Sequence, residues 1–204
     1  MTSALQQLPE GYCEIWRADL QKNKKQALAI NGLALGLGAA MLAPFLYGIF
    51  QPLSSGGIHF HVTQFLAMLA GLLAYIPLHE LVHGLCMKYF GAKKVRYGYT
   101  GLYAWAGSNE YFGRRSYAVI ALAPLAFWGA VLASLCAAVP AQWFWVLYLV
   151  QVANVSGAAG DLYITWKALH MPAEVLIQET GTEMAVYAPQ APAGNRAAGR
   201  PCFQ

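Results

Sequence analysis

Charged residues are scarce in this sequence. Only 11% of its 204 residues are Asp, Glu, Lys or Arg, whereas 58% are hydrophobic. Soluble domains usually carry about a quarter charged residues, so the composition argues against an ordinary soluble domain and favours a membrane protein. The net charge is +4, but Lys and Arg lie at the ends of apolar runs and form no basic stripe with interleaved aromatic residues. This arrangement argues against nucleic acid as a partner and indicates the lipid bilayer instead.

The sequence contains no Cys-x-x-Cys pair, and we expect no cleavable signal peptide. The four cysteines are scattered and include no Cys-x-x-Cys pair, which argues against a sulfur-rich zinc site. About 25 mostly polar residues, ending in Lys24 and Lys25, precede a first apolar run that is longer than the roughly 7–15 residues of a signal core. We therefore expect the first run to remain as a membrane anchor.

Long apolar runs are what the sequence has in abundance. Each of four runs is long enough for the roughly 20 residues that cross the hydrocarbon core of a bilayer as a helix. They cover residues 27–50, 62–87, 116–138 and 141–166. The sequence therefore predicts an all-α membrane protein with about four transmembrane helices.

Basic residues gather on one side of these predicted spans. They precede the first span, lie between the second and third, and follow the fourth, whereas the other two connections contain no Lys or Arg. Because basic residues favour the cytoplasmic side, we expect an integral membrane protein whose N- and C-termini are cytoplasmic. The loop that carries Lys93, Lys94, Arg114 and Arg115 is expected on the same side.

Short β-structure is expected outside the spans. Val95, Tyr97 and Tyr99 alternate before a turn at Thr100 and Gly101, which predicts a β-hairpin between the second and third helices. Two short β-like runs are expected within residues 173–188, on either side of a turn at residues 179–182, followed by a Pro/Gly/Ala-rich tail. The predicted units are a cytoplasmic N-terminal segment (1–26), a four-span membrane domain (27–168), a cytoplasmic β-like segment (169–188) and a disordered tail (189–204).

A His-Glu-x-x-His pattern lies inside the second apolar run. On a helix, His79 and His83 are one turn apart on the same face and can both bind one Zn²⁺, while Glu80 reaches a water molecule as general base. A five-residue pattern with three fixed positions also arises by chance in many proteins. Ionisable groups in a membrane helix are costly, however, at about 2.5–3.5 kcal/mol for a charged one, and they normally mark a functional site.

A catalytic zinc needs a third protein ligand at the same depth. Asp161 lies six residues before Lys167, and His83 lies five before Lys88, so at about 1.5 Å per residue both lie some 8–9 Å from the basic edge. Asp161 is therefore the predicted third ligand, with His170 and Glu174 as weaker candidates.

Two further groups of polar residues lie in or near the spans. Asn154 shares a helix face with Asp161 and is expected to hydrogen-bond a substrate backbone or to orient a ligand; interhelical hydrogen bonding together with Gln151 is an equal alternative. His59 and His61 are excluded from the site, because His61 lies 18 residues before His79, or about 27 Å along a helix.

These features together resemble a known family. With HELVH in a membrane helix, ALAPL in the third span and NVSGAAGD in the fourth, the chain resembles the zincin-type membrane peptidases of bacteria over residues 8–187. More distantly it is similar to the site-2 proteases, which cut substrates within the membrane. The resemblance implies His79, His83 and Asp161 as metal ligands, Glu80 as the catalytic residue and the bacterial inner (plasma) membrane as the location. The chain departs from the site-2 proteases, which typically show an Asn-Pro segment and a Leu-Asp-Gly order, because here the order is Gly160-Asp161-Leu162 with no proline nearby.

Three functions are compatible with this sequence. The leading hypothesis is a membrane-embedded zinc metalloendopeptidase acting on membrane or membrane-proximal proteins through a zinc-activated water. A non-catalytic scaffold or metal-handling protein that keeps the metal site is the main alternative, and a zinc-dependent lipid hydrolase is the third. The sequence specifies neither the substrate nor the oligomeric state.

Overall fold

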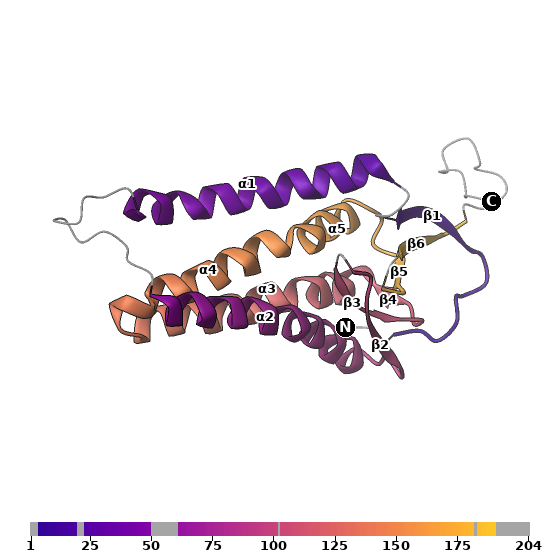
Figure 1. The fold of residues 1–204 in the computed structure, drawn as a ribbon. Coiled ribbons are helices and arrows are strands. Elements are labelled where there is room, and N and C mark those ends of the chain that lie inside the picture. The colour runs from indigo at the N-terminus through magenta and orange to yellow at the C-terminus, as the bar shows by residue number, and fades with distance from the viewer. Residues whose placement is uncertain (1–3, 20–22, 50–60, 102, 182, 191–204) are drawn as a thin grey trace.

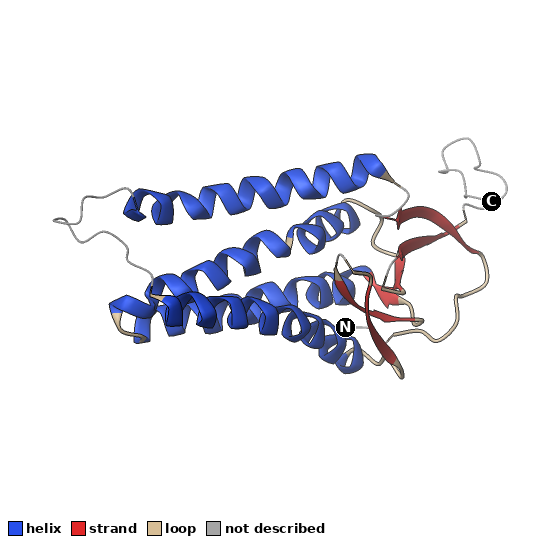
Figure 2. Ribbon diagram, viewed as in Figure 1, coloured by secondary structure: helices blue, strands red, loops and turns tan. Residues whose placement is uncertain are grey.

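The computed structural model describes residues 4–19, 23–49, 61–101, 103–181 and 183–190. Among these residues the fold is mostly helical, and its strands gather at one end of the helices (Figure 2). The helices are α1 (Lys24–Ile49), α2 (Val62–Tyr89), α3 (Arg114–Ala138), α4 (Ala141–Gly157) and α5 (Ala159–Leu169). The strands are β1 (Tyr12–Asp19), β2 (Val95–Tyr99), β3 (Ala104–Ser108), β4 (Phe112–Gly113), β5 (Leu176–Glu179) and β6 (Glu183–Pro189).

Three helices, α1, α2 and α3, are long and apolar enough to cross a membrane. They match the first three predicted spans to within a few residues. The fourth predicted run is divided at Ala158 into α4 and α5, so four single-helix spans are not confirmed. Figure 1 shows α5 continuing from the end of α4, and the Leu162 N–H donates to the Ala158 carbonyl across the division. Gly157 and Gly160 flank this point, and glycine has a low helix propensity.

The end of α2 is fixed by a glycine. Gly91 has a φ of 100°, which is the left-handed conformation that glycine adopts without steric cost. Its N–H donates to the Lys88 carbonyl, and the N–H of Ala92 donates to that of Met87. These two bonds form a Schellman motif, which ends the helix and turns the chain into the hairpin.

The predicted hairpin is present. Strands β2 and β3 pair antiparallel from Val95 opposite Ser108 to Tyr99 opposite Ala104. The turn contains Gly101 with a φ of 88°, as the Thr100-Gly101 pattern predicts. The Tyr97 side chain of the hairpin packs on α2 at Gly84, where a Cβ would lie 2.0 Å from the Tyr97 hydroxyl.

A second, four-stranded sheet has the order β1-β6-β5-β4. The two β-like runs near the C-terminus are β5 and β6, but β1 lies in the N-terminal segment, where no strand was expected. The fold is therefore not purely α-helical. Of the predicted disordered tail, Pro189 ends β6 and the Gln190 N–H donates to Gly11; residues 191–204 lie outside the described part.

The four-stranded sheet covers the ends of α2 and α3. Its inner face contributes to one apolar core together with both helices. The core includes Met87 and Phe90 near the end of α2, Tyr117 and Ile120 in α3, and Ile177 and Val186 in the sheet. This packing fixes β5 beside the first turns of α3, next to the polar residues of α2.

Candidate metal centre

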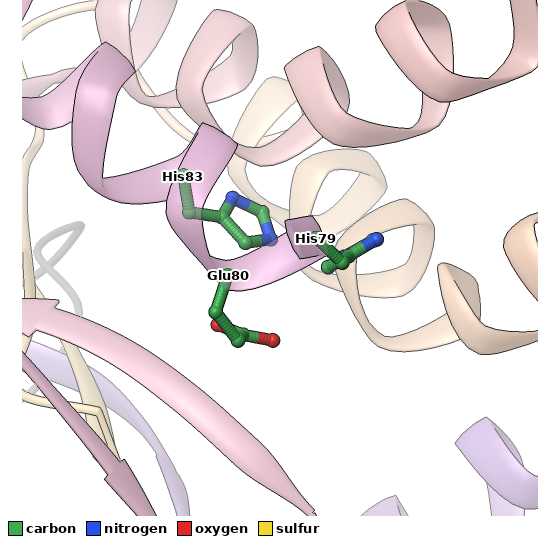
Figure 3. Close-up of side chains that lie close together, drawn as sticks. All are labelled: His79, Glu80 and His83. Carbon is green, nitrogen blue, oxygen red and sulfur yellow. The ribbon is translucent and has the colours of Figure 1, made fainter. Parts of the chain in front are cut away.

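Helix α2 presents the three residues of the His-Glu-x-x-His pattern together. His79 and His83 are each 8% exposed, and their ring centroids are 5.0 Å apart. One ligand atom from each of His79, Glu80 and His83 lies within 4.8 Å of the others. Figure 3 shows Glu80 projecting from α2 away from the two imidazole rings. The helical spacing thus gathers a group that can hold a metal ion.

Asp161, in the first turn of α5, lies against both histidines. Its Oδ2 is 3.3 Å from His79 Nε2, and its Oδ1 is 3.5 Å from His83 Nε2. The structure therefore brings together the three residues predicted as ligands, at a sequence separation of about eighty residues. The alternatives do not come near: the imidazole of His170 contacts the Trp166 carbonyl, and neither His170 nor Glu174 lines the cavity at the site.

The hydrogen bonds of His79 determine which ring nitrogen carries its proton. The Tyr75 hydroxyl lies 2.6 Å from His79 Nδ1 and donates its own hydrogen to Asn154 Oδ1 at 2.9 Å. The amide nitrogen of Asn154 donates to the Leu125 carbonyl, which fixes the amide orientation. Because the tyrosine hydrogen is committed to Asn154, His79 Nδ1 must be the donor to Tyr75. In the neutral ring, His79 Nε2 therefore carries the lone pair.

His83 is held in the same tautomer by the backbone of α3. Its Nδ1 lies 3.0 Å from the carbonyl oxygen of Ile120. A carbonyl can only accept, so His83 Nδ1 carries a hydrogen, and in the neutral ring the lone pair is on Nε2. Outer hydrogen bonds of this kind orient metal-binding histidines and fix their tautomers.

The resulting donor set fits Zn²⁺. In the neutral tautomers, two imidazole lone pairs and the carboxylate of Asp161 face one another, which is a donor set that a cation can bind. Each imidazole Nε2 lies 3.3 or 3.5 Å from one oxygen of the Asp161 carboxylate, which is close to the distance between two ligands of a zinc ion bound at roughly 2.0–2.1 Å. Two histidines and one carboxylate, with an open position, form a common catalytic zinc set.

A cavity of about 420 Å³ opens beside these residues. The histidine and carboxylate side chains in its lining are those of His79, Glu80, His83, Asp161 and Glu179. The carboxyl group of Glu80 faces the hairpin and accepts a hydrogen bond from the backbone of Ala106. An adjoining apolar cavity of about 610 Å³ shares Glu80 and Trp105 with the first. Glu80 therefore stands where a water or substrate group meets the metal-binding residues.

Asn154 lies behind the metal centre. It is 0% exposed and does not line the cavity, so its position matches the ligand-orienting and interhelical alternatives better than substrate contact. It holds Tyr75, which holds His79. Sequence reasoning missed Tyr75, although its spacing of four residues from His79 places both on one helix face. It also missed Glu179, which no local pattern connects to α2.

Comparison with known proteins agrees with this geometry. No curated protein and no solved structure matches the chain. A family model described as "Putative zincin peptidase" matches residues 72–176, which is just over half of the sequence. The match includes His79, Glu80, His83 and Asp161. The chain therefore belongs to this zincin peptidase family.

Proposed function

We propose that the protein is a membrane-embedded zinc metallopeptidase that hydrolyses peptide bonds of membrane or membrane-proximal proteins. The observation that carries the proposal is the convergence of His79 Nε2, His83 Nε2 and the Asp161 carboxylate, with Glu80 beside them in the same cavity. Membership of a zincin peptidase family supports the same reaction class.

Membrane embedding is supported by apolar surface on the long helices. Leu28 and Leu35 on α1 and Val62 on α2 are each 75% exposed, and Leu73 is 61% exposed. Lipid would cover these side chains. We infer that α4 and α5 together form a fourth crossing, which returns the chain to the end that carries the strands. The basic residues at that end support a cytoplasmic location for it, and the inner membrane of a bacterium is the expected location.

The roles of the residues follow from their positions. A zinc ion held by His79, His83 and Asp161 would act as a Lewis acid on the scissile carbonyl and lower the pKa of a water molecule. Glu80 accepts a proton from the attacking water, whose oxygen adds to the carbonyl carbon. Glu80 then passes this proton to the amide nitrogen as the C–N bond breaks. Tyr75 and the Ile120 carbonyl keep both imidazoles in the required tautomer throughout.

An extended substrate suits the hairpin. Within the described part of the chain, β3 pairs with β2 only, and its residues Ala104, Trp105 and Ala106 line the cavity. A peptide strand that adds to the other edge of β3 would expose its carbonyl groups beside Glu80, whereas a helical substrate would keep its carbonyls internally bonded.

The test is cleavage of peptides and membrane-protein segments by the purified protein in detergent. Glu80→Gln keeps the size of the side chain but cannot take the proton, so activity is expected to fall at least about 100-fold. Glu174→Gln is the matched control because Glu174 is exposed and lies outside the cavity. Full cleavage activity of Glu80→Gln would refute the role of Glu80 as the base, and zinc binding without any cleavage by the wild type would favour the scaffold or metal-handling alternative. Cleavage of lipid esters but of no peptide would favour the lipid hydrolase.

A further inference from the structure

Glu179 is an acidic residue in the cavity that the proposed reaction does not use. It ends β5 and lines the cavity together with His79, Glu80, His83 and Asp161. Its side chain accepts a hydrogen bond from the Tyr117 hydroxyl, whereas Asp161 lies against both histidines. Glu179 therefore faces the reaction site without being positioned as a ligand.

The chain holds Glu179 in place from two sides. The hydroxyl of Tyr117, which is 1% exposed, donates to Glu179 Oε2 at 3.0 Å. The turn after Glu179 lies against the hairpin so closely that a Cβ on Gly107 would be 2.4 Å from the Thr180 carbonyl carbon. A Cβ on Gly181 would be 2.0 Å from the Trp105 ring. The fold thus fixes this carboxyl group at the edge of the cavity.

The charge of Glu179 is poorly compensated by the protein. No Lys or Arg is among the described residues that line the cavity, and Tyr117 is a neutral donor. Burial raises the pKa of Glu179 to about 7, with His83 and Asp161 acting on it in opposite directions. Glu179 is half-buried, and a partly desolvated carboxylate with one neutral donor is stabilised by a cation or by further donors. The rest of the cavity wall is largely apolar, with Ile30, Ile76 and Ile164.

We propose that Glu179 is a specificity-determining residue that binds an ammonium group of the substrate, and this inference rests on the proposed peptidase function. The group is either the free amino terminus of a peptide or a lysine side chain. An ammonium group would supply both the charge and the donors that Glu179 lacks. Lysine is common at the cytoplasmic ends of membrane segments, which is the expected side of this cavity.

The experiment measures binding apart from turnover. A fluorescent peptide with a free amino terminus and one lysine is titrated into zinc-loaded Glu80→Gln and into Glu80→Gln/Glu179→Gln. The same titration uses the N-acetylated peptide, the peptide with norleucine in place of lysine, and the peptide with both changes. Glu80→Gln/Glu174→Gln is the matched control, and zinc content together with binding of the doubly changed peptide reports that the variants are folded.

The expected result is a loss of binding of about 10-fold or more on Glu179→Gln for the ammonium-bearing peptide, the usual effect of removing a hydrogen bond to a charged group. The doubly changed peptide should bind both proteins equally. If N-acetylation alone abolishes the difference in peptide affinity between the two proteins, Glu179 binds the amino terminus. If norleucine alone abolishes this difference, Glu179 binds lysine. An equal effect of Glu179→Gln on all peptides, or no effect on any, would overturn the inference. Failure of the wild-type protein to cleave any of these peptides would count against the peptidase function and not against ammonium binding.

Discussion

Replacing Tyr75 with phenylalanine is expected to weaken zinc binding without removing any proposed ligand. The Tyr75 hydroxyl accepts the hydrogen of His79 Nδ1 and donates to Asn154 Oδ1. Without it, the histidine is free to move its hydrogen to Nε2, where the Asp161 carboxylate lies 3.3 Å away and can accept it. Zinc would then have to displace a proton that the wild-type tautomer does not place there.

The magnitude follows from burial and from the role of outer hydrogen bonds. His79 is 8% exposed and Asn154 is 0% exposed, so water does not readily replace the lost hydroxyl. Loss of such a partner usually lowers metal affinity by about 10–100-fold, which is ~1.4–2.8 kcal/mol. We expect the upper part of this range because both partners of the hydroxyl are buried.

The assay is competition for zinc with a chromophoric chelator on purified protein. Tyr148→Phe is the matched control, since its hydroxyl also donates within the helices, to the Met41 carbonyl at 2.7 Å, but does not line the cavity. The control should bind zinc within about twofold of the wild type, because that hydroxyl has no partner at the metal centre. Wild-type zinc affinity in a folded Tyr75→Phe protein would refute the tautomer argument.

Two further predictions concern the hairpin and the topology. Gly107→Ala places a Cβ against the backbone of Thr180, so the melting temperature and peptide cleavage should both fall while zinc content stays near that of the wild type. Gly36→Ala is the control because its Cβ would enter open space. A Gly107→Ala protein with unchanged melting temperature and cleavage would contradict the packing described. In cysteine-labelling experiments on a cysteine-free background, Lys94→Cys should react only from the cytoplasmic side and Ala141→Cys only from the outside, and the opposite pattern would reverse the proposed orientation.

Elements marked by a local sequence pattern were predicted, whereas an element that depends on pairing with a distant segment was missed. The first three helices are visible because an apolar run of membrane length has few other stable structures. Asp161 was found because it lies at the same distance from a basic edge as His83. Strand β1 was missed because Tyr12–Asp19 pairs with β6, at the other end of the chain.

The division of the fourth run and the role of Glu179 depend on packing. Gly157 and Gly160 indicated close helix approach, and nothing local distinguished this from a break at Ala158. Glu179 reaches the cavity only because β5 pairs with β4 and β6 and packs on α3. Tyr75 was predictable from its helical spacing to His79, but its hydrogen bond to Asn154 joins two helices and required the structure.

The zinc content of purified Asp161→Ala and Glu80→Gln, determined by elemental analysis beside the wild type, tests the central claim most directly. Asp161→Ala removes a proposed ligand and should lose most of the metal, since two histidines alone do not complete a zinc site. Glu80→Gln should keep about one zinc per chain, because its carboxylate is assigned to proton transfer. Full zinc occupancy in Asp161→Ala would contradict the proposed metal centre, and loss of zinc in Glu80→Gln would show that Glu80 binds the metal instead of acting as the base.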